Sequence, residues 1–180
     1  MIGFINGLIF ANAAEWVIHK YILHEEGRKK DSFWRFHYVE HHKNARLNDF
    51  LDPDYEKSIF EWNAQSKEAF ALAVGAISQI PIFPISPSFV LGVWTSMGYY
   101  YYIHKKSHEE PNFAREHLPW HYDHHMGKNQ DANWCVTFPL FDNIMGTRIP
   151  YVGTEQEIED RKLRQEKLAK RNKEDLLSKN

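Results

Sequence analysis

The stretch from residue 69 to residue 103 restricts the fold more than any other feature, because it holds no charged side chain over 35 residues. Its centre, PIFPISPS, places Pro81, Pro84 and Pro87 where a helix would have to break. The pattern predicts an apolar helical hairpin with arms of about 15 to 17 residues, at the short end of the ~20 that a membrane span needs. We expect the hairpin to insert into a membrane, and the alternative is a buried hairpin in a soluble core.

The N-terminus, MIGFINGLIFANAAEWVIHKYILH, is a second apolar segment. No basic residue precedes Lys20, so the segment lacks the positively charged start of a signal peptide. We therefore expect residues 1–18 to form a retained helix that anchors the chain in a membrane or spans it.

The C-terminal residues have the opposite character. Of the 26 residues from 155 to 180, 15 are charged, with both signs mixed, and the apolar positions form a poor helical stripe. The pattern predicts one domain over residues 1–150, followed by a charged tail over residues 151–180 that is a solvated helix or frayed. The formal net charge of −2 gives no general attraction to nucleic acid.

Eleven histidines are gathered into four short groups along the chain. A neutral imidazole is best suited to proton exchange and metal ligation, and no proton shuttle needs so many copies. The single cysteine, Cys135, excludes an intramolecular disulfide and a cysteine-based zinc site. The groups are His19 and His24 in HKYILH, His37, His41 and His42 in HYVEHH, His104 and His108 in HKKSH, and His117, His121, His124 and His125 in HLPWHYDHH.

The spacing within these groups is typical of metal ligands on helices, because positions i, i+3 and i+4 share one helix face. His19 and His24 are the exception, since residues five apart diverge by ~140° on a regular helix. They can converge only through a helix end, a bulge or an ion that lies between helices. The pairs that fit a regular helix are His37 with His41, His104 with His108, and His121 with His124 and His125.

Ten imidazoles are too many for one ion, but they fit two ions with four or five ligands each. Imidazole suits iron, zinc, copper and nickel, whereas magnesium and calcium prefer oxygen. Two nitrogen-rich ions beside an apolar segment favour iron and dioxygen chemistry; the alternatives are a zinc-dependent hydrolase and a non-catalytic metal-binding membrane protein. We leave His117 out of the ligand set. Candidates to orient the imidazoles are Glu15, Glu40, Asp123 and Asp131.

The order of the motifs, HX4H, HX3HH, apolar hairpin, HX3H and HX2HH, resembles the fatty acid hydroxylase/sterol desaturase superfamily of membrane di-iron enzymes. The resemblance covers roughly residues 15–148 and includes the segment NWCVTFPLFDNIMGT, with Asn133, Thr137, Asp142 and Gly146 at pattern positions. The second group reads HX3HH where HX2HH is common in the family. The chain also has about three apolar arms, fewer than typical members.

The resemblance implies an all-α fold in which apolar, membrane-associated helices carry a histidine-rich helical metal-binding cap. It also implies two iron ions, for which zinc can substitute, together with O2, an external electron donor and a redox partner protein. The expected reaction is hydroxylation of a lipid-like substrate at an unactivated C–H bond, with desaturation on the same scaffold as the alternative. The implied metal ligands are His19, His24, His37, His41, His42, His104, His108, His121, His124 and His125.

Basic residues lie beside the histidine groups, whereas the hairpin tip carries no charge. Positively charged residues near membrane segments favour the cytoplasmic side. We therefore expect an integral membrane protein whose metal-binding face is cytoplasmic. The basic residues in question are Lys20, Arg28, Lys29, Lys30, Lys105 and Lys106.

Overall fold

A computed structural model describes residues 1–178, and every regular element in that range is helical. The chain begins with α1 (Ile2–Val17), which runs directly into a π-helical segment, η1 (Ile18–Glu26). In residues 1–178 this continuous stretch, Ile2–Glu26, is the one that is long and apolar enough to cross a membrane, judged by length and composition. The predicted apolar N-terminal helix is therefore present, and it carries the first histidine pair at its far end.

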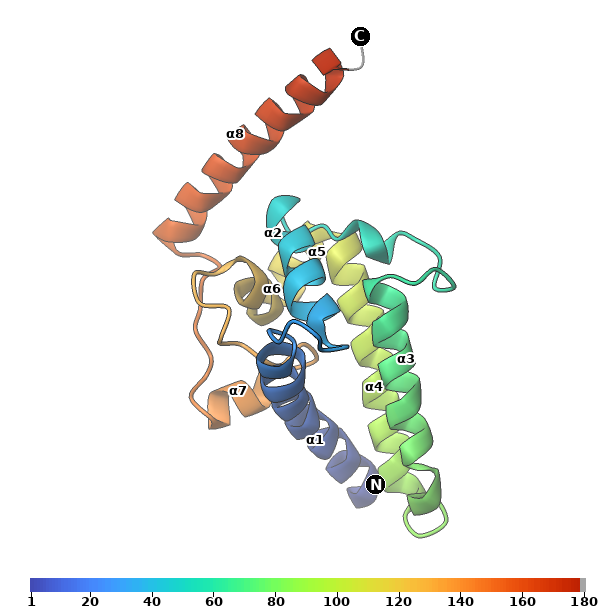
Figure 1. The fold of residues 1–180 in the computed structure, drawn as a ribbon. Helices are drawn as coiled ribbons and strands as arrows, with labels where there is room; N and C mark the ends of the chain where they lie inside the picture. Colours follow the sequence, from blue (N-terminus) through green and yellow to red (C-terminus); the bar gives the residue numbers. More distant parts are fainter. Residues whose placement is uncertain (179–180) are drawn as a thin grey trace.

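The predicted hairpin is formed by α3 (Ala64–Ser78) and α4 (Pro87–Glu109), joined by a turn that contains the short 3-10 helix η4 (Ile80–Ile82). An Asn63–Ser66 capping box starts α3, and Pro87 occupies the first turn of α4, where its missing N–H is not needed. Both helices extend beyond the uncharged stretch, α3 at its start and α4 at its end. Figure 1 shows them antiparallel, with their turn at the same end of the molecule as the N-terminus.

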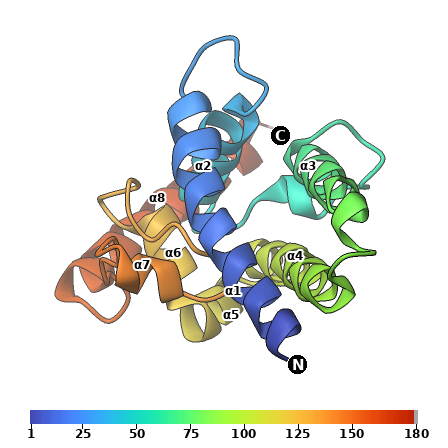
Figure 2. The same cartoon turned by 90° about the horizontal axis from the view of Figure 1, so that it is seen from below.

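Helices α1 and α4 approach each other closely because glycines lie at their contact. A Cβ atom added to Gly92 would lie 2.2 Å from the carbonyl oxygen of Phe4, and one added to Gly7 would lie 2.2 Å from that of Phe89. Small residues of this kind allow the backbones of membrane helices to touch. Figure 2, seen from below, shows α1 between the α3–α4 pair and α7.

Short helices form a cap over the ends of η1 and α4 that lie away from the hairpin turn (Figure 1). Prolines begin the first turns of α5 and α6. The cap comprises η2 (Phe36–His41), α2 (His42–Leu47), η3 (Pro53–Tyr55), α5 (Pro111–His117) and α6 (Pro119–Met126). The segment after α6 runs alongside α1 to α7 (Leu140–Ile144), which packs beside α1 (Figure 1).

The charged tail forms α8 (Glu155–Ser178), and its first turns pack against the cap. Glu157 is fully buried and accepts a hydrogen bond from Arg115 at 2.9 Å, while Arg164 donates to Asp49 at 3.0 Å. The rest of α8 projects away from the body (Figure 1). The expectation of a solvated or frayed tail thus does not hold for the first turns, which partly buried ion pairs anchor. Residues 179–180 of the predicted tail lie outside the described residues.

Candidate metal centre

Nine of the ten predicted ligands gather into two compact groups whose ring nitrogens lie within 4.8 Å of one another inside each group. All nine are buried. We call His19, His24, His37, His42 and His124 the first group, and His41, His104, His108 and His125 the second group.

The tenth predicted ligand, His121, lies at the edge of the second group. Its Nε2 is 3.1 Å from Nε2 of His108, and its ring centroid is 4.7 Å from that of His125. His117, by contrast, is exposed, packs against the ring of Phe113, and belongs to neither group. The structure therefore leaves His117 of α5 apart from His121 of α6, and the sequence interpretation likewise left His117 out of the ligand set.

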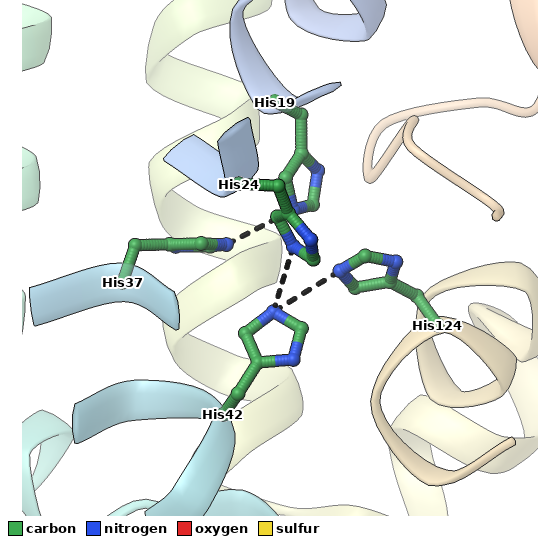
Figure 3. Close-up of side chains that lie close together, drawn as sticks. All are labelled: His19, His24, His37, His42 and His124. Carbon is green, nitrogen blue, oxygen red and sulfur yellow. Dashed lines mark hydrogen bonds between the residues drawn. The ribbon is translucent and has the colours of Figure 1, made fainter. Parts of the chain in front are cut away.

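Two π-helical turns explain how histidines five residues apart come together. In a π-helix the backbone bonds join residues i and i+5, so that residues five apart lie about one turn apart on the same side. His19 and His24 share the π-helical segment η1, and His37 and His42 are separated in the same way across η2. All four imidazoles consequently point into the first group (Figure 3). The divergence expected for a regular helix is removed by this change of helix type.

The π-helical segment η2 also changes which histidines belong to the same group. The i, i+4 spacing allowed His37 and His41 to face one ion, but His37 lies in the first group and His41 in the second. Helix α6 likewise divides its ligands, with His124 in the first group and His125 in the second. The regular helix α4 keeps its pair, His104 and His108, together in the second group, as its spacing predicted.

The ring nitrogens of the first group are spaced as ligands of a shared ion would be. Nε2 of His37 is 2.9 Å from that of His19, and Nε2 of His42 is 3.2 Å and 3.1 Å from those of His24 and His124 (Figure 3). Two nitrogens bound to one ion at ~2.1 Å and at right angles would be about 3.0 Å apart. A ring–ring hydrogen bond could explain one such contact at His42, whereas a shared ion accounts for both.

The second group contains buried ring nitrogens that lack any hydrogen-bond partner among the described residues. They are Nε2 of His41, of His104 and of His125, together with Nδ1 of His125. A buried polar atom without a partner is destabilising by ~1–3 kcal/mol, and three unpartnered Nε2 atoms in one small volume need a common explanation. Metal ligation would satisfy all three, so the donor set fits a metal ion in the second group as well.

The opposite ring nitrogen, Nδ1, is held by a fixed partner in most of these histidines. Such contacts set the ring orientation and leave Nε2 free for a metal. The Nδ1 partners are the carbonyl oxygens of Trp134 for His19 (2.5 Å), Ala132 for His124 (2.7 Å) and Phe50 for His108 (2.9 Å), the carboxylates of Asp52 for His41 (2.7 Å) and Glu68 for His104 (2.9 Å), and the amide of Gln130 for His42 (3.1 Å).

Sequence reasoning missed Asp52, Glu68 and Gln130, since their contacts join segments far apart along the chain. The sequence did contain one signal, since Glu68 is the last charged residue before the apolar stretch. In the structure this residue is buried. The four predicted orienting residues behave differently. Asp131 lies 3.6 Å from Nδ1 of His24, whereas Glu15 binds the backbone of Val136 and Thr137, Glu40 pairs with Lys67, and Asp123 pairs with Arg148.

Burial keeps the imidazoles of His42, His124 and His125 neutral, which is the form that binds metal. Burial and the neighbouring His124 ring hold the pKa of His42 well below its usual value. Burial and the neighbouring His42 ring do the same to the pKa of His125. Burial also lowers the pKa of His124 to about 3, against the opposing effect of its hydrogen bond to the Ala132 carbonyl.

A comparison with known protein families agrees with this geometry. The family model described as fatty acid hydroxylase matches residues 4–147, which is most of the chain and includes every histidine of both groups. The chain belongs to the fatty acid hydroxylase family. No curated protein and no solved structure matched the chain. Members of this family are oxidoreductases, and membership indicates a lipid-like substrate and a membrane context.

In this member of the fatty acid hydroxylase family an apolar cavity of about 360 Å³ lies between α1, α3 and α4 and reaches the first group of histidines. His19 and His37 of the first group line its inner end together with Glu68. Ser78 and Gln79, at the end of α3, line it at the level of the hairpin turn. The rest of the lining is mostly apolar, with Glu15 and Ser96 as polar members, and includes Phe10, Ala14, Leu23, Phe36, Leu72 and Met97.

Proposed function

We propose that this chain is a non-haem di-iron, O2-dependent oxidoreductase that hydroxylates a lipid-like substrate at an unactivated C–H bond. One observation carries the proposal: two groups of buried imidazoles adjoin each other, and the first group lines the inner end of an apolar cavity. The cavity suits a flexible hydrocarbon chain, because almost all of its lining is apolar. Family membership supports the same class of reaction.

The residues present fit two iron ions. The five imidazoles of the first group would hold one ion, and the second group together with His121 would hold the other. A donor set of imidazoles without thiolate suits iron, and zinc can substitute for it. When bound, iron would supply the activation of O2 and the oxidising power that breaks a C–H bond, with electrons from an external donor through a redox partner protein.

The role of the chain itself is positioning. The apolar walls between α1, α3 and α4 would bind the hydrocarbon and exclude water, so that the reactive carbon lies beside His19 and His37. The partners of the Nδ1 atoms hold the imidazole rings in fixed orientations. Fixed rings keep the ligand geometry constant while the substrate enters and leaves.

We further propose that the protein is integral to the membrane with its metal-binding face in the cytoplasm. The apolar stretch Ile2–Glu26 supports insertion, and the N-terminus and the α3–α4 turn lie together at the end away from the cap (Figure 1). The basic residues Lys20, Arg28 and Lys105 lie at the cap end, and positive charge favours the cytoplasmic side.

The test is product analysis with isotopically labelled O2. Protein purified anaerobically in detergent should contain two irons per chain and should transfer label into a lipid alcohol when a reductant and a lipid extract are supplied. Loss of two hydrogens without label would identify a desaturase instead. Release of a fatty acid without O2 consumption would identify a hydrolase, and metal binding without any turnover would identify a non-catalytic metal-binding protein.

A matched pair of histidine variants makes this test specific. His108→Ala removes a member of the second group and should abolish turnover, because a chain that has lost one ion lacks half of the proposed centre. His117→Ala removes an exposed histidine outside both groups and should leave iron content and turnover near those of the wild type. Equal effects of the two substitutions would contradict the proposed ligand set.

A further inference from the structure

The two histidine groups differ in the chemistry behind their imidazoles. In the second group, His41 and His104 each contact a buried carboxylate through Nδ1, Asp52 at 2.7 Å and Glu68 at 2.9 Å. Asp52 is fully buried and Glu68 is 8% exposed. Both carboxylates are held in place, Asp52 by Asn44 and Glu68 by the hydroxyl of Tyr55.

In the first group the corresponding partners are neutral. His19 and His124 contact backbone carbonyl oxygens, and His42 contacts the side-chain amide of Gln130. The nearest carboxylate contact is Asp131, 3.6 Å from His24. The Asp131 side chain is 52% exposed and also pairs with Arg28, so that its charge is both screened and compensated.

The number of ligands does not separate the two groups. The first group has five imidazoles, and the second has five when His121 is included. The difference therefore lies in the partners behind the rings. A carboxylate that accepts the Nδ1 proton increases the basicity of the imidazole, and loss of such a partner typically lowers metal affinity by ~10–100-fold. Two buried carboxylates also place negative charge close to the bound cation.

The two groups also differ in their contact with the apolar cavity, which favours easier metal exchange in the first group. His19 and His37 of the first group line the apolar cavity, whereas within residues 1–178 no histidine of the second group lines it. The Phe50 ring stacks on His108 at 4.5 Å, and the Tyr55 ring stacks on the same imidazole at 5.4 Å. Aromatic rings thus cover His108 of the second group, whereas two imidazoles of the first group line the cavity.

We propose that the second group is the high-affinity metal position, filled first and emptied last, and that Asp52 and Glu68 are positioning residues that set this order. The first group is then the exchangeable position, beside the cavity. This inference rests on the proposed two-metal centre and adds a difference in metal affinity between its two positions.

The experiment follows metal release from the full chain in detergent. Protein loaded with two equivalents of Zn²⁺ is challenged with excess EDTA, and released zinc is measured with time. We expect two phases, each of one ion per chain. His37→Ala should remove the fast phase and His108→Ala the slow phase, which assigns each phase to its group independently of enzyme activity.

Three isosteric variants then test the positioning residues. Asp52→Asn and Glu68→Gln should each accelerate the slow phase by about 10–100-fold while leaving the fast phase near its wild-type rate. Asp131→Asn removes the carboxylate that lies beside His24 of the first group, and it should leave the slow phase unchanged. Circular dichroism before the challenge checks that each variant is folded, and a merely structural role would accelerate both phases together.

The outcomes separate the two proposals. Release of both zinc ions in a single phase would overturn the order of affinity and would leave the two-metal centre intact. Acceleration of only the fast phase by Asp52→Asn or Glu68→Gln would also overturn it. Binding of fewer than two zinc ions by the wild type would overturn the two-metal centre itself, and with it the proposed difference in affinity between the two positions.

Discussion

Glu15 on α1 accepts a hydrogen bond from the hydroxyl of Thr137, 2.6 Å away and 122 residues further along the chain. It also accepts the backbone N–H groups of Val136 and of Thr137. The same extended segment provides the carbonyl oxygens of Ala132 and Trp134 that contact His124 and His19. Glu15 thus fixes the segment that orients two imidazoles of the first group.

The Glu15→Gln variant should therefore lose stability and zinc together. The amide cannot accept all three hydrogen bonds, and a buried donor left without a partner destabilises by about 1–3 kcal/mol. Denaturant titration in detergent measures the free energy of unfolding, and mass spectrometry measures zinc per chain. Glu25→Gln, an exposed position on η1, is the control and should change stability by less than ~0.5 kcal/mol. Equal stability of the two variants would remove the proposed role of Glu15.

A second prediction concerns the stability of variants at the glycine contact between α1 and α4. Gly92→Ala should destabilise by about 1–3 kcal/mol, because the new Cβ would lie 2.2 Å from the rigid Phe4 carbonyl oxygen and must push the helices apart. Gly98→Ala, on the same helix with nothing within 4 Å of the new Cβ, should be neutral or stabilising by about 0.5–1 kcal/mol. Thermal unfolding of both variants in detergent distinguishes these effects, and equal transition temperatures would contradict the close contact.

Much of this architecture follows from the sequence, because its signals are local. The absence of charge over residues 69–103 with prolines at its centre predicted the helical hairpin, and α3 and α4 confirm it. The i, i+4 spacing predicted the pairing of His104 with His108. Such features depend on one helix at a time, so the repeat of a regular α-helix is enough to predict them.

The features that the sequence did not predict depend on contacts between distant segments or on a change of helix type. The π-helical turns that bring His19 to His24, and His37 to His42, have no simple residue pattern. The partnership of Glu68 with His104 joins two helices across the hairpin. In each case the tertiary packing of the histidine-bearing helices selects the local geometry.

Acidification should unfold the metal-free protein. The pKa values of His42 and His125 are held below the ordinary value of 6.5, chiefly by burial. Below about pH 6.5 the unfolded chain takes up protons that the folded chain excludes, so the free energy of unfolding should fall as pH decreases and should be nearly constant above it. Denaturant titrations of EDTA-treated protein between about pH 8 and pH 5 measure this slope.

The control for the pH experiment is the exposed histidine. His117→Ala should keep the wild-type slope, since this ring is exposed and lies outside both groups. His125→Phe should reduce the slope, because it removes one of several buried imidazoles that take up a proton when the chain unfolds at low pH. A stability that is independent of pH in this range would show that the buried imidazoles are solvated in the metal-free state.

The last prediction is that the residue at position 75 controls the length of hydrocarbon chain that the cavity accepts. Gly75 lines the cavity on α3, seven residues from Glu68 and therefore about 10 Å along the helix axis from the inner end. A Cβ atom at Gly75 would lie 3.0 Å from the terminal methyl of Met97, a flexible side chain that can move aside. Gly75→Leu should therefore fold, while its new side chain occupies the outer part of the cavity.

The Gly75→Leu variant should discriminate against long hydrocarbon chains and still accept short ones. A few methylene groups that no longer fit each weaken binding by about 1–3 kcal/mol, so kcat/KM for long over short acyl substrates should fall at least about 10-fold. The measurement is competition between acyl substrates of graded length, with zinc or iron content determined in parallel. Gly98→Leu adds the same side chain at an exposed position of α4 that does not line the cavity, and should keep the wild-type ratio. If Gly75→Leu keeps that ratio as well, with its metal content intact, the hydrocarbon chain does not lie along α3 and binds elsewhere.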